Sequence, residues 1–296
     1  MKVQAAVSVA RLKKTMQAGS FKDKTVIITG ASAGVGAACA RAFAAQQAKL
    51  VLVARGAAAL AEIAAELSPR TSVLTVAMDV ANNADCLALM EKAVAEFGAI
   101  HVLVNNAGVH LRGPVENRAP QDLAAMVDVN LRAPLVLSAA ALPNIRRAGG
   151  GAIVMVGSLA GLAPLQGAAT YSATKAGLRA FTYALADELR GTGINVGVVS
   201  PGPIPTGFII AEIDQVEDIV FSQPMSSAEQ VADAVLALAA GAQTEITMPG
   251  FGGKLATLGY LFPSLRRRMR KSLYAKGRKN KGAYVREIQG KLSGKS

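Results

Sequence analysis

The sequence has no tryptophan, and aromatic residues make up only 4% of its 296 residues. Cysteine is almost as scarce: Cys39 and Cys86 are the only two, and neither has a CxxC or histidine partner at metal-ligand spacing. A disulfide-stapled fold is therefore excluded. We expect two small buried thiols, no bound metal and a reducing compartment, the cytoplasm.

A long apolar leader is also missing at the N-terminus, since Arg11, Lys13 and Lys14 interrupt the short apolar run there. We therefore predict no cleaved signal peptide. The segment from Ala148 to Thr174 has no charge, which is typical of a membrane span. Its glycines and Pro164 favour instead a buried strand, a loop and the start of a helix.

Acidic residues are nearly absent from the C-terminal part of the chain. From Lys254 onward there are 13 Lys or Arg residues and one acid, Glu287. The first 253 residues have 19 residues of each sign, so the net charge of +12 belongs entirely to the tail. We accordingly divide the chain into an extension (1–21), a main domain (22–253) and a basic tail (254–296).

Hydrophobic residues, 51% of the chain, fall into short apolar runs that alternate with helical patterns. The predicted strands are Thr25–Thr29, Leu50–Ala54, Ser72–Ala77, His101–Asn105, Ala152–Val156, Asn195–Ser200 and Thr244–Met248. The predicted helices are Gly36–Gln46, Ala57–Leu67, Asn83–Phe97, Gln121–Ala141, Ala169–Arg190 and Ser227–Ala240. This alternation predicts an α/β, doubly wound, parallel seven-stranded sheet with helices on both faces.

Residues 203–226 interrupt this alternation with prolines, acids and large apolar side chains. Ligands of parallel sheets bind outside the carboxyl ends of the strands. We therefore expect this segment to be a lid over a substrate rather than a surface excursion without a role.

A glycine-rich turn, TGASAGVG (Thr29–Gly36), follows the first predicted strand. Glycines allow backbone N–H groups at a helix start to approach a pyrophosphate closely. The next strand ends at Arg55, where an enzyme that binds a ribose 2′-hydroxyl would have Asp or Glu. An arginine there favours a 2′-phosphate, so NADP(H) is the preferred cofactor and NAD(H) the alternative.

Tyr171 stands four residues before Lys175, so one helical turn separates a phenol from a cation. A tyrosine has an ordinary pKa near about 10 and exchanges protons at neutral pH only when its surroundings assist. A YxxxK match alone is weak. Ser158 and the run Asn105–Gly108 each follow a strand, which brings three segments to one sheet edge.

These motifs resemble the short-chain dehydrogenase/reductase family, whose members have a single-domain Rossmann fold. The resemblance extends from about Lys22 to Pro249. It rests on TGASAGVG, Asp79–Val80, NNAG, Asn130, Ser158, YSATK, and Pro201–Gly202 with Thr206, in the family's order. Many NADP-preferring relatives have a basic residue before the second glycine of the turn, where this chain has Ala33. The predicted preference for NADP(H) therefore depends on Arg55 alone.

The resemblance implies roles residue by residue. Tyr171 would be the general acid and base, Lys175 would lower its pKa and bind the nicotinamide ribose, Ser158 would hold the substrate oxygen, and Asn130 would order a water that resupplies the proton. It also implies a homodimer or homotetramer. The cofactor-binding residues would be Gly30, Ser32, Gly34, Val35, Gly36, Arg55, Asp79, Val80, Asn106, Ala107, Gly108, Tyr171, Lys175, Pro201, Gly202 and Thr206.

The tail shows Leu255, Leu258, Phe262, Leu265, Met269 and Leu273 at helical spacing beside a basic face, with a helix expected over Pro263–Ala275. Four interpretations stay open: residues 255–275 bind an anionic membrane surface, dock an acidic acyl carrier protein, form a subunit contact, or are solvated. The membrane surface is favoured, and nucleic acid is not expected.

These features predict an oxidoreductase that transfers a hydride between NADP(H) and a ketone or secondary alcohol, with an apolar, lipid-like or steroid-like substrate. A reductase of 3-oxoacyl groups on acyl carrier protein or coenzyme A is the alternative within the class. A nucleotide-sensing scaffold without turnover is the alternative outside it. We assign no role to His110, which follows NNAG.

Overall fold

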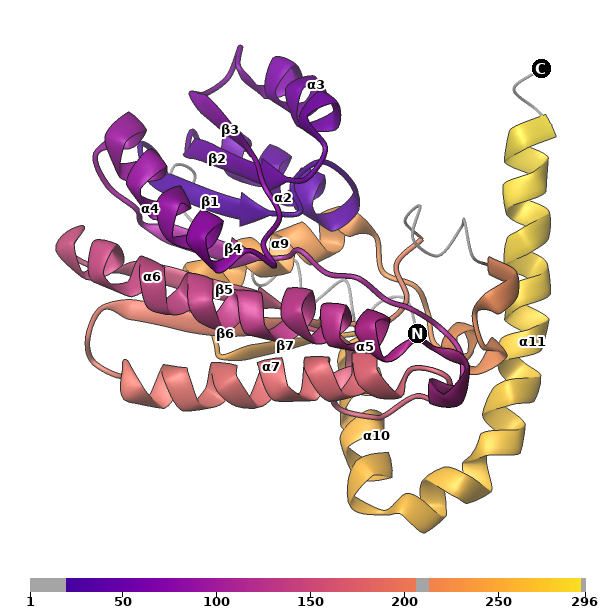
Figure 1. Ribbon diagram of the computed structural model, residues 1–296. Helices are drawn as coiled ribbons and strands as arrows, with labels where there is room; N and C mark the ends of the chain where they lie inside the picture. The colour runs from indigo at the N-terminus through magenta and orange to yellow at the C-terminus, as the bar shows by residue number, and fades with distance from the viewer. Residues whose placement is uncertain (1–19, 206–212, 294–296) are drawn as a thin grey trace.

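Seven parallel strands form one sheet within residues 20–205 and 213–293, which the computed structural model describes (Figure 1). The sheet order is β3-β2-β1-β4-β5-β6-β7. The predicted doubly wound Rossmann fold is confirmed. The strands are β1 (Thr25–Thr29), β2 (Lys49–Ala54), β3 (Val73–Ala77), β4 (Val102–Asn105), β5 (Gly151–Val156), β6 (Ile194–Pro201) and β7 (Glu245–Met248).

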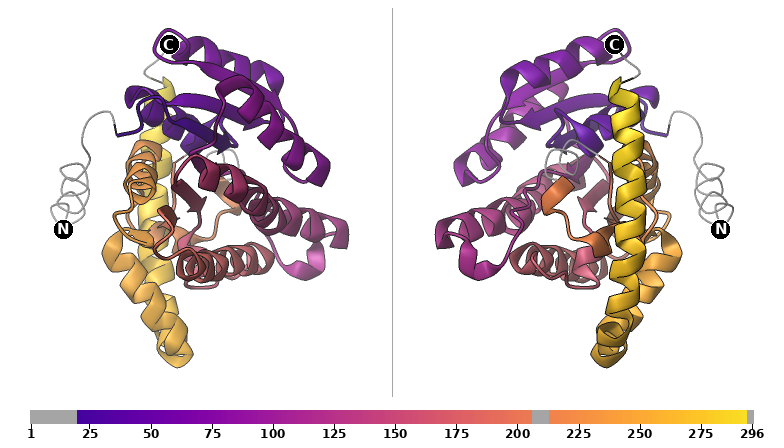
Figure 2. Two further views of the ribbon diagram at one scale, coloured as in Figure 1. Left: turned by 90° about the vertical axis from the view of Figure 1, so that its left-hand side faces the viewer. Right: turned by 90° about the vertical axis from the view of Figure 1, so that its right-hand side faces the viewer.

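Helices cover both faces of this sheet (Figures 1 and 2). They are α2 (Gly34–Ala45), α3 (Ala57–Leu67), α4 (Asn83–Phe97), α5 (Pro120–Val127), α6 (Ala133–Arg147), α7 (Ala169–Glu188), α9 (Ala228–Ala239), α10 (Gly250–Leu261) and α11 (Pro263–Ser293). Single helical turns are η1 (Val115–Asn117), η2 (Asp128–Arg132), η3 (Leu159–Gly161), η4 (Ile213–Gln215) and η5 (Asp218–Ser222).

The core consists of two aliphatic layers, one on each face of the sheet. Side chains of α2 and α9 pack with alternate residues of the strands on one face, and those of α4, α6 and α7 on the other. Strands buried on both sides need apolar residues at nearly every position, which is why the inner strands β1, β2, β4 and β5 have apolar sequences. Each fully buried Val, Leu or Ile contributes about 1.5 to 3 kcal/mol.

The two cysteines lie in this core, as predicted. Both thiols are free and buried, Cys39 in α2 and Cys86 in α4. Burial raises the pKa of Cys39 to about 12, because an apolar environment disfavours the thiolate. The thiol of Cys39 is therefore unreactive at neutral pH.

The strand order reverses between β1 and β4, which are hydrogen-bonded neighbours in the centre of the sheet. The chain leaves β1 for the β2 side and leaves β4 for the β5 side. Consequently the loops that follow these two strands diverge at the carboxyl edge, the place where a doubly wound sheet is expected to have its binding crevice. A doubly wound sheet binds its ligand at this switch point.

The helix predicted over Gln121–Ala141 is present and longer, from Pro120 to Arg147, and it contains one π-helical turn. A π-helical turn, η2, separates α5 from α6, and α6 continues through Pro143 to Arg147. The sequence pattern does not reveal this turn because its residues keep the apolar spacing of the flanking helices. The turn matters since it contains Asn130.

The tail contains more helix than predicted. The segment Gly250–Leu261 forms α10, which its glycines concealed, and α11 continues past Ala275 to Ser293. Gly277 does not end α11 because its small size is needed there: a Cβ atom would lie 1.8 Å from the carbonyl oxygen of Asp218. Tertiary packing thus overrides the low helix propensity of glycine.

The stretch 120–147 is the one part of the described residues long and apolar enough to cross a bilayer, with a mean hydropathy of 1.4. It consists of α5, η2 and α6. Leu137, Ala141 and Ile145 of α6 are fully buried against the sheet, as in a core helix of a globular domain. The uncharged segment 148–174 forms β5, η3 and the start of α7, as expected.

Candidate active site

The turn after β1 is joined to the end of β4 by a set of hydrogen bonds. Thr29 Oγ1 accepts from the N–H groups of Asn106 and Ala107, both at 3.0 Å. Asn106 Nδ2 donates to the carbonyl oxygens of Thr29 at 2.9 Å and Gly30 at 3.2 Å. TGASAGVG and NNAG, far apart in the sequence, therefore form one rigid wall of the crevice.

The start of α2 packs closely on the turn after β1 because Gly36 lacks a side chain. A Cβ atom at Gly36 would lie 2.0 Å from the carbonyl oxygen of Gly30 and 2.7 Å from Asn106 Nδ2. The N-cap residue, Ala33, makes no side-chain hydrogen bond to the first turn. The N–H groups and positive end of the helix are thus open to an anion, and these residues fit the pyrophosphate of a dinucleotide.

The candidate adenosine side lies at the ends of β2 and β3. Arg55 follows β2 with an exposed side chain. Asp79 is also exposed, and its Oδ1 accepts from the N–H of Ala81 at 2.9 Å, while Val80 is buried. The structure therefore places a cation and a carboxylate beside the ends of neighbouring strands.

Asn130 holds the loop that follows NNAG. Its Oδ1 accepts from the N–H of Val109 and its Nδ2 donates to the Val109 carbonyl, both at 2.8 Å. Its Nδ2 also donates to Thr174 Oγ1 at 3.4 Å, which connects the loop to α7. Asn130 is fully buried, so these bonds satisfy an amide that would otherwise destabilise the fold.

Lys175 lies below the crevice, with 5% of its surface exposed. Its Nζ donates to the carbonyl oxygen of Val156 at 2.9 Å, at the end of β5. Burial lowers its pKa from 10.5 to about 8, because a charge is costly away from water. A Cβ at Gly108 would lie 3.7 Å from this Nζ, so NNAG approaches the ammonium closely.

Tyr171 sits one turn before Lys175 on α7, with Lys175 Nζ 5.8 Å from the centre of its ring. Burial raises the pKa of Tyr171, while a hydrogen bond with Ser158 and the charge of Arg112 counteract this effect. The phenol is therefore protonated at neutral pH. Ser158, at the N-cap of η3, accepts from the N–H of Ala160 at 3.1 Å, which orients its hydroxyl.

His110 is a site residue to which the sequence assigned no role. Its ring stacks on Tyr171 with centroids 4.0 Å apart and planes 12° apart. Burial, with the nearby charges of Arg112 and Lys175, lowers the pKa of His110 to about 3, so the ring is neutral. The only sign of this role in the sequence is that His110 lies five residues after the end of β4. This position does not distinguish a residue that stacks on the catalytic tyrosine from one that fills space in the loop.

The remaining predicted site residues follow β6. Pro201 ends the strand, and the N–H of Gly202 donates to the carbonyl oxygen of Met248 at 2.7 Å. Thr206 lies outside the described residues. The described part of the expected lid includes η4 and η5; Val216, between the two turns, and Phe221 of η5 are buried with 1% exposure each.

The helix α11 packs along η5 (Figure 1). Lys281 Nζ donates to the carbonyl oxygen of Val216 at 2.7 Å and lies 3.7 Å from Asp218 Oδ1. Asn280 Nδ2 donates to the Phe221 carbonyl at 2.9 Å, and the rings of Phe221 and Tyr284 are 6.1 Å apart. The basic tail thus has a structural partner in the chain itself.

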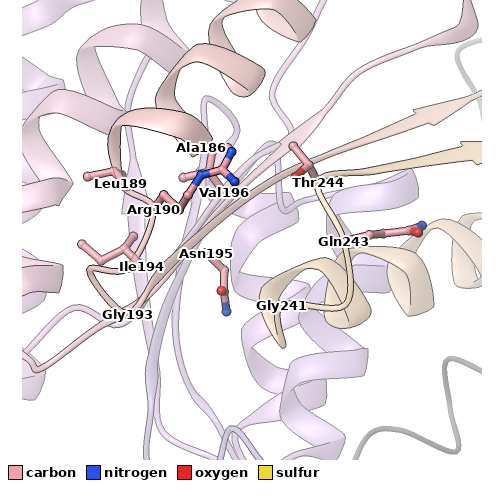
Figure 3. Close-up of a pocket in the computed structure, with 11 residues that line it drawn as sticks. Ala186, Leu189, Arg190, Gly193, Ile194, Asn195, Val196, Gly241, Gln243 and Thr244 are labelled. Atoms are coloured by element: carbon pink, nitrogen blue, oxygen red, sulfur yellow. The ribbon is translucent and has the colours of Figure 1, made fainter.

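A hollow of about 230 Å³ lies between the C-terminal end of α7 and the β6–β7 edge (Figure 3). Its lining includes Ile194 and Thr244, at the amino ends of β6 and β7. The predicted catalytic residues follow carboxyl ends of strands. The hollow is therefore separate from the candidate active site.

Comparison with known proteins shows which family the chain resembles. A family model described as short chain dehydrogenase matches residues 24–216. The ketoacyl reductase HetN of Nostoc sp. is 35% identical over 232 residues, 77% of this chain and 79% of its own length. Sulfoacetaldehyde reductase 2 of Chromohalobacter salexigens is 38% identical over 187 residues, 62% of this chain and 74% of its own.

Proposed function

The chain belongs to the short-chain dehydrogenase family, and from this premise we propose that it interconverts a ketone and a secondary alcohol with NADP(H), on an apolar, lipid-like or steroid-like substrate. The observation that carries the proposal is the contact of Tyr171 with Ser158, one helical turn from the buried ammonium of Lys175. The nicotinamide supplies or accepts the hydride when it is bound.

The protein groups move and stabilise the proton. In reduction, the Tyr171 hydroxyl donates its proton to the carbonyl oxygen, whose negative charge grows as the carbonyl carbon gains hydride. Ser158 donates a hydrogen bond to the same oxygen and stabilises that charge. The resulting phenolate lies near the cation of Lys175. By the family resemblance Asn130 would order the water that returns the proton to Tyr171, while its side-chain amide holds Val109 and Thr174.

The cofactor preference rests on Arg55. Its exposed guanidinium follows β2, at the position from which a side chain reaches the adenosine ribose. A guanidinium binds a 2′-phosphate by paired, charge-assisted hydrogen bonds, whereas a 2′-hydroxyl offers no charge. NADP(H) is therefore preferred over NAD(H), with Asp79 at the adenine.

The substrate preference rests on the expected lid, residues 203–226. Its described part has large apolar side chains, such as Val220 and Phe221, and α11 holds it in place. A 3-oxoacyl thioester is the second candidate, which the name of the ketoacyl reductase relative favours. A long acyl chain would suit an apolar lid equally well.

The test is NADPH oxidation by the purified protein with ketosteroids, long-chain 3-oxoacyl thioesters and small aldehydes. We expect turnover with one apolar class, slower turnover with NADH, and loss of turnover in Tyr171→Phe with NADPH affinity retained. Arg55→Asp should reverse the preference between NADPH and NADH. Retention of turnover by Tyr171→Phe would contradict the mechanism.

The panel also separates an enzyme from a nucleotide sensor. Tight NADPH binding with no turnover of any carbonyl would favour a scaffold without catalysis. For assembly we propose a homodimer or homotetramer through α5, α6 and α7. Val127 and Tyr183, on α5 and α7, are large apolar residues left exposed there, at 39% and 38%. Analytical ultracentrifugation tests this assembly.

A further inference from the structure

The corner between α10 and α11 gathers apolar side chains on the surface. Among the described residues eight large apolar side chains are exposed, and four of them lie within five positions at this corner: Leu258 (42%), Tyr260 (61%), Leu261 (65%) and Phe262 (54%). Isolated exposed apolar residues are common, but a contiguous group marks a contact surface. We call these four residues the apolar corner.

The apolar corner projects away from the sheet. In Figures 1 and 2, α10 descends from the body of the protein and the chain turns at its lower end; in Figure 1, α11 then rises at the right-hand side of the molecule. Pro263 starts α11 directly after Phe262, which forces the turn and leaves the side chains at its tip without cover. A projecting tip can enter a soft surface without a matching groove in a partner.

Cations flank the apolar corner. Arg267, Arg268, Arg270 and Lys271, in the first turns of α11, are all exposed. No acidic residue occurs between Glu245 and Glu287 to neutralise them. Arg270 lies over the ring of Tyr274, 5.3 Å from its centre, so this cation is held at the surface beside an aromatic ring. A surface that complements the apolar corner and its cations would therefore have an apolar interior and an anionic outer layer.

We propose that the apolar corner and these four cations dock the protein on an anionic phospholipid bilayer. Leucine and aromatic side chains enter the boundary between headgroups and acyl chains, while arginines and lysines bind the lipid phosphates. The helices themselves stay outside the hydrocarbon, since α10 has only 12 residues and α11 is strongly basic.

Docking at this corner bears on the active site, a consequence that rests on the proposed function. The inner face of α10 packs on the loop after β5, where Ala256 contacts Leu159 and Leu162, next to Ser158. Farther along α11, Lys281 and Asn280 hold the lid segment. A lipid-like ketone would therefore leave the bilayer close to the catalytic serine.

The test is flotation of the full-length protein with vesicles, without cofactor or substrate. We expect binding to vesicles of phosphatidylcholine mixed with phosphatidylglycerol, little binding to phosphatidylcholine alone, and release by salt. The double variant Leu261→Ser/Phe262→Ser should reduce the partition coefficient at least about tenfold. Arg267→Gln/Arg268→Gln should reduce it by about the same factor.

Matched controls use equally exposed residues elsewhere. Leu87→Ser on α4, where Leu87 is 56% exposed, and Arg146→Gln on α6 should leave vesicle binding unchanged. Turnover of a water-soluble ketone should be the same in all four variants, which separates failure of docking from failure of the proposed reductase activity.

Four results would overturn the proposal. The unaltered protein could fail to float with anionic vesicles, or Leu261→Ser/Phe262→Ser could float as well as the unaltered protein. Light scattering could instead show that this variant dissociates a dimer that does not bind vesicles, which would make the apolar corner a contact between copies. Retention on a purified acidic acyl carrier protein, without vesicle binding, would assign the corner to a protein partner.

Discussion

The imidazole of His110 lies flat on the phenol of Tyr171, with ring centroids 4.0 Å apart and planes 12° apart. The residue that donates the proton in our mechanism therefore has one face covered by a neutral ring. This stack fixes the plane of the phenol and keeps water from that face. His110 is thus a positioning residue for Tyr171.

Replacement of His110 separates stacking from charge. A stacked pair contributes about 0.5 to 1.5 kcal/mol, so His110→Ala should lower kcat up to about tenfold, while His110→Phe should retain most of it. Because the pKa of His110 is about 3 in the fold and 6.5 ordinarily, the unfolded chain takes up the proton first. The stability from its neutral ring is present above pH 6.5 and is lost as the pH falls toward 3.

Urea unfolding between pH 7 and pH 4 measures this loss. Part of the acid destabilisation should disappear in His110→Phe, which cannot titrate. An unchanged pH dependence of unfolding in that variant would refute the assignment. The kcat comparison stands separately, since it is made at neutral pH.

We expect the buried charge of Lys175 to lower the stability of the fold while it is needed for turnover. Its pKa is about 8 in the fold and 10.5 ordinarily, so the unfolded chain binds more protons between these values and stability rises with pH across that window. Below pH 8 the cost is fully present, about 3 kcal/mol. Lys175→Met should abolish turnover yet raise the melting temperature at pH 7.

Calorimetry at pH 7 and activity on the same preparation check both outcomes. Lys92→Met, at an exposed position of α4, is the control and should change neither quantity. A lower melting temperature in Lys175→Met would show that the hydrogen bond to Val156 outweighs the cost of burying the charge.

Gly36→Ala should block the cofactor site. Its Cβ would lie 2.0 Å from the Gly30 carbonyl oxygen, so either α2 or the turn must move. We expect destabilisation of about 1 to 3 kcal/mol and at least about tenfold weaker NADPH binding, measured by fluorescence titration. Gly56→Ala is the control, because a Cβ there has no atom within 4 Å. Equal NADPH affinity in the two variants would disprove the steric argument.

Lys281→Met should loosen the lid without touching the cofactor crevice. The Lys281 ammonium donates to the Val216 carbonyl and lies 5.7 Å from the centre of the Phe221 ring. We expect KM for the carbonyl substrate to rise about three- to tenfold, which corresponds to about 0.7 to 1.4 kcal/mol, with the Kd for NADPH unchanged. Lys279→Met, at an exposed position two residues before Lys281, is the control. The role of 203–226 as a lid is contradicted if KM stays the same.

Most of the sheet was predictable because the inner strands are buried on both sides and are therefore apolar runs, as in Thr25–Thr29 and Ala152–Val156. The motifs could be placed because the carboxyl ends of parallel strands share one edge. The sequence did not predict two features that depend on tertiary packing. One is the wider turn η2 around Asn130, and the other is the continuation of α11 through Gly277, which fits against Asp218.

The sequence by itself determined which apolar runs form strands, the position of the glycine-rich turn, the pair Tyr171–Lys175 and the confinement of excess positive charge to the tail, since these follow from residue type and spacing. The tertiary structure alone decided that His110 covers Tyr171, that α11 returns to hold η5, and that the apolar corner is left exposed. These relationships join segments far apart in the chain, or depend on what covers a residue. The local sequence pattern predicts neither the contacts between distant segments nor the burial of a residue by its neighbours, because both are set only when the elements pack.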